Sequence, residues 1–220
     1  MSKPGAYGVC SLCNKRVAKS AMKRHLDTCL EASVEEGKDA SELVLLRVES
    51  RDKIYWLYLG VKPNVKLQEI DQALQDVWLA CCGHLSEFFR GEMSEELKMG
   101  STIQSVLKAD DRPFEYIYDF GSSTELIITP LGRYKAAPSR QKLRFLARNE
   151  APNWGCGVCG EPATDFCTEC FYDEDPGPLL CAEHAKAHEQ EDEDHEGMLL
   201  PVVNSPRMGV CAYIGPVQME

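Results

Sequence analysis

The last third of the chain carries eight candidate metal ligands in one ordered series, and this series constrains the fold more than any other feature. In order they are Cys156, Cys159, Cys167, Cys170, Cys181, His184, His188 and His195. Two CxxC pairs, a CxxH pair and two further histidines at short spacing are typical of two tetrahedral zinc sites. His195 also has an alternative interpretation as a solvated side chain, because it lies inside the acidic run EQEDEDHE.

A second ligand set lies near the start of the chain and predicts a third zinc ion. It consists of Cys10, Cys13, His25 and Cys29. The two cysteines predict a tight turn, and His25 and Cys29 are four residues apart, which places them on one face of a helix. About twenty residues with few apolar side chains cannot form a core unaided, so zinc would supply the folding energy, on the order of 10 kcal/mol. Without zinc we expect this segment to be unfolded.

Composition and charge favour a cytoplasmic protein with zinc as its cofactor. No apolar run approaches the roughly 20 residues that span a bilayer, so no membrane partner is expected. Cysteines paired with histidines, in a chain without a secretion signal, favour metal ligation over the alternative of disulfides. The net charge of -11 is unevenly distributed. Residues 1–30 carry six Lys or Arg against Asp27, whereas residues 150–196 hold fourteen Asp or Glu against Lys186, an acidic end that would repel nucleic acid.

The middle of the chain predicts an α+β domain. Two β-prone runs, ELVLLRVES and KIYWLYLGV, predict a hairpin, and apolar residues at helical spacing predict a helix from Leu67 to Cys81. Further strands are expected over 114–120, 125–129 and 143–147. The expected domains are a finger over 1–30, a linker over 31–41, a mixed α+β domain over 42–150, a two-zinc module over 151–197 and an apolar tail over 198–220 that packs on a domain.

Two segments in the middle of the chain are distinctive, CCGHLSEF at Cys81 to Phe88 and FEYIYDFGSSTEL at Phe114 to Leu126. They resemble the motifs of a family found on plasmids and insertion elements, the passenger TnpR or plasmid pRiA ORF-like family. Zinc-rich archaeal and bacterial relatives are also similar in LARNEAP and LPVVNSPRMGVC. The chain departs from the family at KIYWLYLG, which replaces its usual proline, tryptophan and twin-arginine segment. The resemblance implies an association with mobile elements but no reaction, and no serine recombinase pattern is present.

Both ends of the chain resemble zinc modules. CSLCNKRVAKSAMKRHLDTCL is similar to the ubiquitin-binding zinc fingers of DNA-repair ubiquitin ligases, which implies a ubiquitin-like partner contacting Asp27. The C-terminal ligand order resembles a B-box, a cross-braced interaction module. That resemblance implies one ion held by Cys156, Cys159, Cys181 and His184, and the other by Cys167, Cys170, His188 and His195.

Sites closed by four protein ligands hold shape and have no vacant position for a substrate. We therefore expect a zinc-binding adaptor or interaction protein with an unidentified protein partner and no catalytic or cofactor-binding residue beyond its zinc ligands. The alternative is a nucleic-acid-binding or nucleic-acid-processing factor associated with mobile elements. Its phosphate contacts would come from the basic finger residues Lys15, Arg16, Lys19, Lys23 and Arg24.

An enzymatic interpretation rests on Cys81, Cys82, His84 and Glu87, with Asp119 as a further partner. A cysteine and a histidine can act as nucleophile and base, or can hold an additional metal. The structural alternative is that Cys81 continues the apolar helix face, Cys82 ends the helix and His84 is a satisfied core histidine. We expect the structural alternative.

Overall fold

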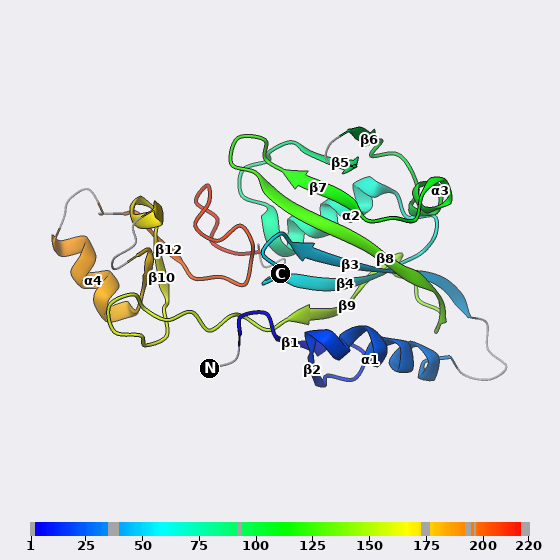
Figure 1. The fold of residues 1–220 in the computed structure, drawn as a ribbon, viewed down its shortest axis with the longest axis horizontal. Helices are drawn as coiled ribbons and strands as arrows, with labels where there is room; N and C mark the ends of the chain where they lie inside the picture. Colours follow the sequence, from blue (N-terminus) through cyan, green and yellow to red (C-terminus); the bar gives the residue numbers. More distant parts are fainter. Residues whose placement is uncertain are drawn as a thin grey trace. The chain divides into compact units, whose positions relative to one another are not determined.

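The computed structural model describes residues 3–34, 40–91, 94–172, 177–191, 195 and 197–216. The chain divides into two compact units, one formed by residues 1–74 with 85–150 and the other by residues 75–84 with 151–220. We call them unit 1 and unit 2. Both combine helices with antiparallel strands, which confirms the predicted α+β class (Figure 1). Among the described residues, no helix combines the length and the apolar character needed to cross a membrane.

Unit 1 is built on a sheet of nine antiparallel strands in the order β2-β1-β9-β4-β3-β8-β7-β5-β6. Their bounds are β1 Tyr7–Cys10, β2 Arg16–Ala18, β3 Ser41–Ser50, β4 Trp56–Val61, β5 Ser86–Arg90, β6 Glu95–Leu97, β7 Phe114–Tyr118, β8 Thr124–Ala136 and β9 Leu143–Asn149. The predicted hairpin is confirmed, because β3 pairs with β4 from Val44 opposite Val61 to Glu49 opposite Trp56. The later strands predicted from the sequence correspond to β7, β8 and β9.

Two helices of unit 1, α1 (Lys19–Ala32) and α2 (Leu67–Leu74), pack on opposite faces of the sheet. Directly paired residues share a face, so Val48, Ile128 and Phe114 lie on one side, together with Tyr116 two residues further along β7. The Tyr116 hydroxyl donates to Asp71 of α2 at 2.7 Å, which assigns α2 to this side. Leu45 of β3 faces the other side and packs in the core that α1 shares. A short helix, α3 (Ile103–Ala109), follows β6.

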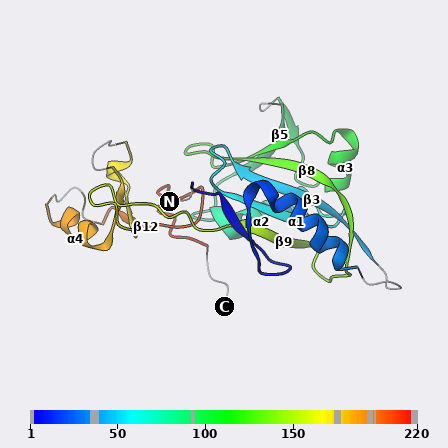
Figure 2. The same ribbon diagram turned by 60° about the horizontal axis from the view of Figure 1, so that its bottom comes forward.

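The N-terminal finger is continuous with this sheet. Strand β1 pairs with β2 and also with β9, where Cys10 lies opposite Ala147 (Figure 2). The sequence predicted the turn and the helix of the finger but not its strands. Met22, Leu26 and Leu30 of α1 are fully buried in a core that includes Leu45 and Trp56. This shared core corrects the expectation that zinc alone supplies the folding energy of the finger, because apolar burial against the sheet contributes as well.

Gly8 of β1 is a point of close approach between the finger backbone and the core. A Cβ atom at this position would collide with the carbonyl oxygen of Arg148 and with the ring of Trp56, which is fully buried. Gly8→Ala is therefore expected to lower the free energy of unfolding by about 2 kcal/mol through overpacking. Gly100→Ala is the matched control, since a Cβ atom there meets nothing within 4 Å. Urea unfolding of both variants tests this, and equal stabilities would contradict it.

Unit 2 contains a smaller three-stranded sheet in the order β11-β10-β12. Its elements are the π-helix η1 Gln75–Leu79, β10 Asp165–Cys167, the 3-10 helix η2 Glu169–Tyr172, β11 Leu179–Leu180, α4 Ala182–Glu191 and β12 Leu199–Pro201. The apolar tail begins as β12, which pairs with β10, and continues as a series of turns. Ser205, Arg207 and Tyr213 in these turns are buried.

The helix predicted over residues 67–81 is present only in part. It is α-helical to Leu74 and then continues as η1, where the Ala80 amide donates to the Gln75 carbonyl at 2.9 Å. This i to i+5 bond adds a residue to the turn, so that the consecutive Trp78 and Leu79 are both buried. Cys81 lies beyond the last turn, and the prediction that it extends the apolar helix face is wrong.

Candidate metal centres

Four groups of four side chains contain every cysteine and every histidine of the chain, eleven and five residues respectively. Within each group, the ligand atoms all lie within 4.8 Å of one another. Zinc bonds of about 2.3 Å to sulfur and about 2.0 Å to nitrogen place the ligands of a tetrahedral site roughly 3.3 to 3.8 Å apart. The donor sets and the distances therefore fit zinc, which stays a prediction along with the number of ions.

The Cys10 group joins Cys10 and Cys13 to His25 and Cys29 of α1. His25 Nε2 lies 3.2 Å from Cys13 Sγ and 3.4 Å from Cys29 Sγ, and the two sulfurs are 3.8 Å apart. The strand β1 delivers the first cysteine, the following turn delivers the second, and one face of α1 delivers the other two ligands. These four side chains are the N-terminal set that the sequence predicted.

The CxxC segments that begin at Cys10 and Cys156 have the same turn geometry. The residue after the second cysteine is in the left-handed conformation in each, Asn14 with φ 58° and Gly160 with φ 78°. Its amide donates to the carbonyl of the first cysteine at 2.8 Å in both turns. Asparagine and glycine tolerate this conformation, so the sequence supports a turn that brings the two sulfurs of each CxxC segment together.

Backbone amides in these turns favour the thiolate, which is the form that binds zinc. Burial opposes ionisation of Cys156, but hydrogen bonds from the backbones of Cys159, Cys181 and Val158 outweigh it and lower the pKa of this thiol to about 6. A hydrogen bond from the backbone of Lys15 likewise lowers the pKa of Cys13. In each turn the backbone therefore favours the thiolate of one cysteine, Cys13 in the first turn and Cys156 in the second.

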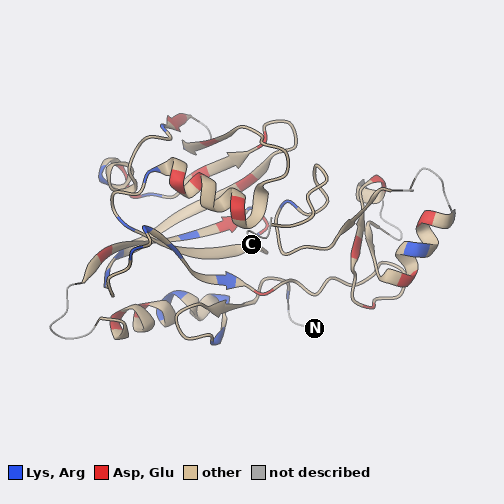
Figure 3. Cartoon of the chain, turned by 180° about the vertical axis from the view of Figure 1, so that it is seen from behind, with Lys and Arg blue, Asp and Glu red and all other residues tan. Residues whose placement is uncertain are grey.

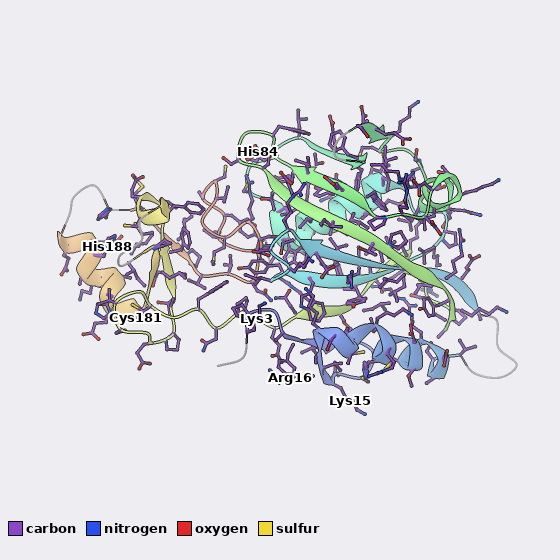
Figure 4. The ribbon with its side chains drawn as sticks, viewed as in Figure 1. Lys3, Lys15, Arg16, His84, Cys181 and His188 are labelled. Atoms are coloured by element: carbon purple, nitrogen blue, oxygen red, sulfur yellow. The ribbon has the colours of Figure 1, made fainter. Side chains whose placement is uncertain are left out.

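The remaining predicted ligands form two interleaved groups around α4. The Cys156 group joins Cys156 and Cys159 to Cys181 and His184, and the Cys167 group joins Cys167 and Cys170 to His188 and His195. This membership is the alternating one that the B-box resemblance implies. Figure 4 labels Cys181, just before α4, and His188, near its far end, which belong to different groups.

His195 lies at the Cys167 group rather than standing apart from it. Its Nε2 is 3.8 Å from Cys170 Sγ, and its ring stacks on that of His188 with centroids 4.1 Å apart. His188 Nε2 is 3.4 Å from the same sulfur. In the Cys156 group, His184 Nδ1 lies 3.1 Å from Cys181 Sγ and 3.6 Å from Cys156 Sγ.

The cluster considered as an enzymatic site is a fourth group of the same composition, the Cys81 group. It consists of Cys81, Cys82, His84 and Cys211, and all four residues belong to unit 2. Cys211 is the candidate ligand that sequence reasoning missed. A signal for it was present, because these four residues are the cysteines and the histidine left over once the other twelve ligands are assigned.

The other two residues of the enzymatic interpretation belong to unit 1. Glu87 lies on β5, where it pairs with Ile117. Asp119 has a positive φ of 65°, and its carboxylate accepts a hydrogen bond from the amide of Gly121 at 2.9 Å. Asp119 therefore stabilises its own turn at the end of β7.

Asp27, the proposed ubiquitin contact, is held inside unit 1. Its carboxylate accepts hydrogen bonds from the Tyr134 hydroxyl at 2.7 Å and from Lys23 Nζ at 2.9 Å. Burial disfavours the charged carboxylate, but these two donors outweigh burial and lower the pKa of Asp27. The side chain therefore stabilises the packing of α1 against β8.

Basic residues lie on α1 and the strands beside it (Figure 3), but several of them have acidic partners. Arg16 pairs with Glu150 at 2.7 Å, and Lys19 pairs with the buried Glu49 at 2.8 Å. Lys15 and Arg16 project from the outer side of the finger (Figure 4). Intramolecular pairing thus neutralises part of the positive charge that the sequence suggested for phosphate binding.

Comparison with known proteins adds a distant structural likeness. The chain matches no protein-family model and no curated protein. A solved structure of a protein of unknown function from Methanosarcina mazei Go1 is 13% identical, and the match covers 52% of this chain and 70% of that chain with a TM-score of 0.41. At this level the likeness carries no argument, and membership of the passenger TnpR family stays a prediction.

Proposed function

We propose that this chain is a zinc-binding adaptor protein whose metal centres hold the surfaces that a protein partner recognises. The observation that supports this most strongly is the closed ligand set, since each group offers four cysteine or histidine ligands to one ion. Four protein ligands complete the tetrahedral coordination of zinc and leave no position for a substrate or a reactive water. Such sites stabilise a fold rather than perform chemistry.

The finger is the proposed partner surface, and a ubiquitin-like protein is the proposed partner. Asp27 is the residue that carries this resemblance, yet its carboxylate is already bonded to Lys23 and Tyr134. Binding through Asp27 would therefore compete with two intramolecular hydrogen bonds, and we expect the contact to be weak. Lys23 and Tyr134 would also lie at such an interface.

Nucleic-acid binding is the second candidate, and it is favoured by the basic residues on the outer side of the finger (Figure 4). Lys15 and Arg24 are exposed. The ion pairs with Glu150 and Glu49 are made by other basic residues of the finger, Arg16 and Lys19. A phosphate contact made by these residues would be weakened by added salt, because binding releases counterions from the nucleic acid.

One experiment separates the two candidates. The zinc-loaded chain is titrated with ubiquitin by calorimetry and with labelled duplex DNA by anisotropy at low salt, as the parent, as two test variants and as one control variant. An adaptor should bind ubiquitin, lose that binding in Asp27→Ala, and keep it in the Lys15→Glu, Arg24→Glu double variant. Lys98→Glu, an exposed charge reversal elsewhere in unit 1, is the control. DNA binding that is lost only in the double variant, together with no binding of ubiquitin, would support the second candidate and overturn the first.

A further inference from the structure

We propose that Cys81, Cys82, His84 and Cys211 form a fourth zinc site, which fastens the C-terminal segment to the segment that follows η1. The inference does not depend on the proposed function, because it concerns the metal content of unit 2 and not its partner. The four ligands come from two segments more than a hundred residues apart in sequence. Figure 4 labels His84, which lies in the loop that leads into β5.

The distances within the Cys81 group match those of the other three groups. His84 Nε2 lies 2.9 Å from Cys82 Sγ and 3.2 Å from Cys211 Sγ. The Cys82 sulfur is 3.3 Å from that of Cys211 and 3.8 Å from that of Cys81. All four ligand atoms lie within 4.8 Å of one another, so one ion can contact them after small side-chain shifts, and its binding would release the three thiol protons.

Both chain segments that carry the ligands have residues in the left-handed conformation, which turn the backbone and bring the ligands together. Gly83 has φ 79°, which turns the chain between Cys82 and His84. Cys211 and Ala212 both have φ 52°, a left-handed conformation that costs free energy in residues with a Cβ atom. Two consecutive residues of this kind are maintained only where surrounding contacts require them, and a metal bond to Cys211 is such a contact.

A buried arginine supplies the charge that this site requires. A zinc ion with three thiolates and a neutral histidine carries a single net negative charge. Arg207 is fully buried, and its Nη2 lies 3.8 Å from Cys81 Sγ, within reach of an N–H to sulfur hydrogen bond. A guanidinium next to the sulfur of Cys81 would offset that charge and orient the ligand, as outer-shell partners of metal sites do.

The same segment is anchored next to η1 by hydrogen bonds that do not involve the metal. The Ser205 hydroxyl donates to the carbonyl of Trp78 at 2.6 Å and accepts from the amide of Arg207 at 2.8 Å. Ser205 and Arg207 are therefore fixed close to the segment that carries Cys81 and Cys82. This anchor lowers the entropic cost of bringing Cys211 to the site.

Two other uses of these residues are less consistent with the geometry. The 2.9 Å contact between Cys82 and His84 also suits a nucleophile and its base, but the sulfurs of Cys81 and Cys211 occupy the space around the Cys82 sulfur. A disulfide between Cys82 and Cys211 would leave His84 and Cys81 without a shared role. Only a metal uses all four side chains at once.

Exposure distinguishes the Cys81 group from the other three and provides the test. None of the four ligands of the Cys81 group is buried, whereas each of the other groups has at least one buried ligand. Cys82 and Cys211 are exposed. Exposed thiols react with alkylating reagents unless a metal protects them. The full chain, purified with a thiol reductant and zinc, is weighed by native mass spectrometry and treated with iodoacetamide before and after a chelator is added.

We expect one more zinc ion than the three other groups can hold, with Cys82 and Cys211 protected until the chelator is added. Cys211→Ser and Cys82→Ser should each lose one ion, whereas the control Ala212→Ser, at the exposed position beside Cys211, should lose none. Three ions in the parent chain, with Cys82 and Cys211 alkylated at once, would overturn the proposal. So would a parent chain lighter by two hydrogen masses, which signals a disulfide. The measurements on the parent chain decide the matter even if the variants fail to fold.

Discussion

Replacement of Cys159 by serine is expected to unfold the part of unit 2 that contains β10, β11 and α4, while the sheet of unit 1 stays folded. Among the described residues, candidate metal ligands make up most of the buried cluster of this region, which joins Cys156, Cys167 and Cys170 to Leu180 and Ala185. A core of this size cannot offset the conformational entropy of the chain. A structural zinc ion contributes on the order of 10 kcal/mol, so the loss of one ligand should exceed the stability of the region.

Hydrogen exchange followed by peptide mass spectrometry provides the measurement. In Cys159→Ser, amides of residues 156–172 and 177–191 should exchange as in an unfolded chain, and those of β3 and β8 should keep their protection. Val158→Ser is the matched control, because the neighbouring Val158 side chain is 53% exposed and is not a ligand. Loss of protection in β3 and β8 as well would show that the two units do not fold independently.

The second large effect concerns the attachment of the finger to the sheet. Leu26 of α1 is fully buried among residues that include Leu45, Trp56 and Leu146. Leu26→Ala would leave a cavity in this core, and we expect a loss of about 3 kcal/mol in the free energy of unfolding. The ligands His25 and Cys29 are unchanged, so we expect the zinc content to stay the same.

Urea unfolding and a zinc assay on the same sample separate the two contributions. Arg24→Ala is the control, since Arg24 is exposed on the same helix. It should unfold within a few tenths of a kcal/mol of the parent chain, as surface substitutions usually do. If Leu26→Ala were as stable as the control, the finger would depend on its metal alone, as the sequence had suggested.

Local patterns in the sequence were sufficient for much of the fold and for most of the candidate ligands. The hairpin β3 and β4 follows from two β-prone runs around Arg51 and Asp52, and it pairs as expected. Most of the twelve predicted ligands occur in the sequence as pairs separated by two or three residues, such as CxxC and CxxH. This short spacing by itself indicates metal binding. Their grouping around α4 followed from a resemblance rather than from spacing.

Features that depend on long-range contacts were not predictable in the same way. Cys211 is a lone cysteine in an apolar segment, and only the fold brings its sulfur to within 3.3 Å of Cys82 Sγ. The pairing of β1 with β9 joins residues about 140 positions apart, and nothing in YGVC identifies its partner. The π-turn after Leu74 depends on tertiary burial of Trp78 and Leu79, which overrides helical periodicity.

Whether the four groups of cysteines and histidines bind zinc is decided by counting the metal ions bound to the chain. Native mass spectrometry of the reduced, zinc-loaded protein, compared with its mass under denaturing conditions, counts the bound ions. We expect four zinc ions, one for each group, and no cysteine open to alkylation, because all eleven cysteines belong to the four groups. A folded chain that carries no zinc and whose cysteines react freely or form disulfides would contradict it.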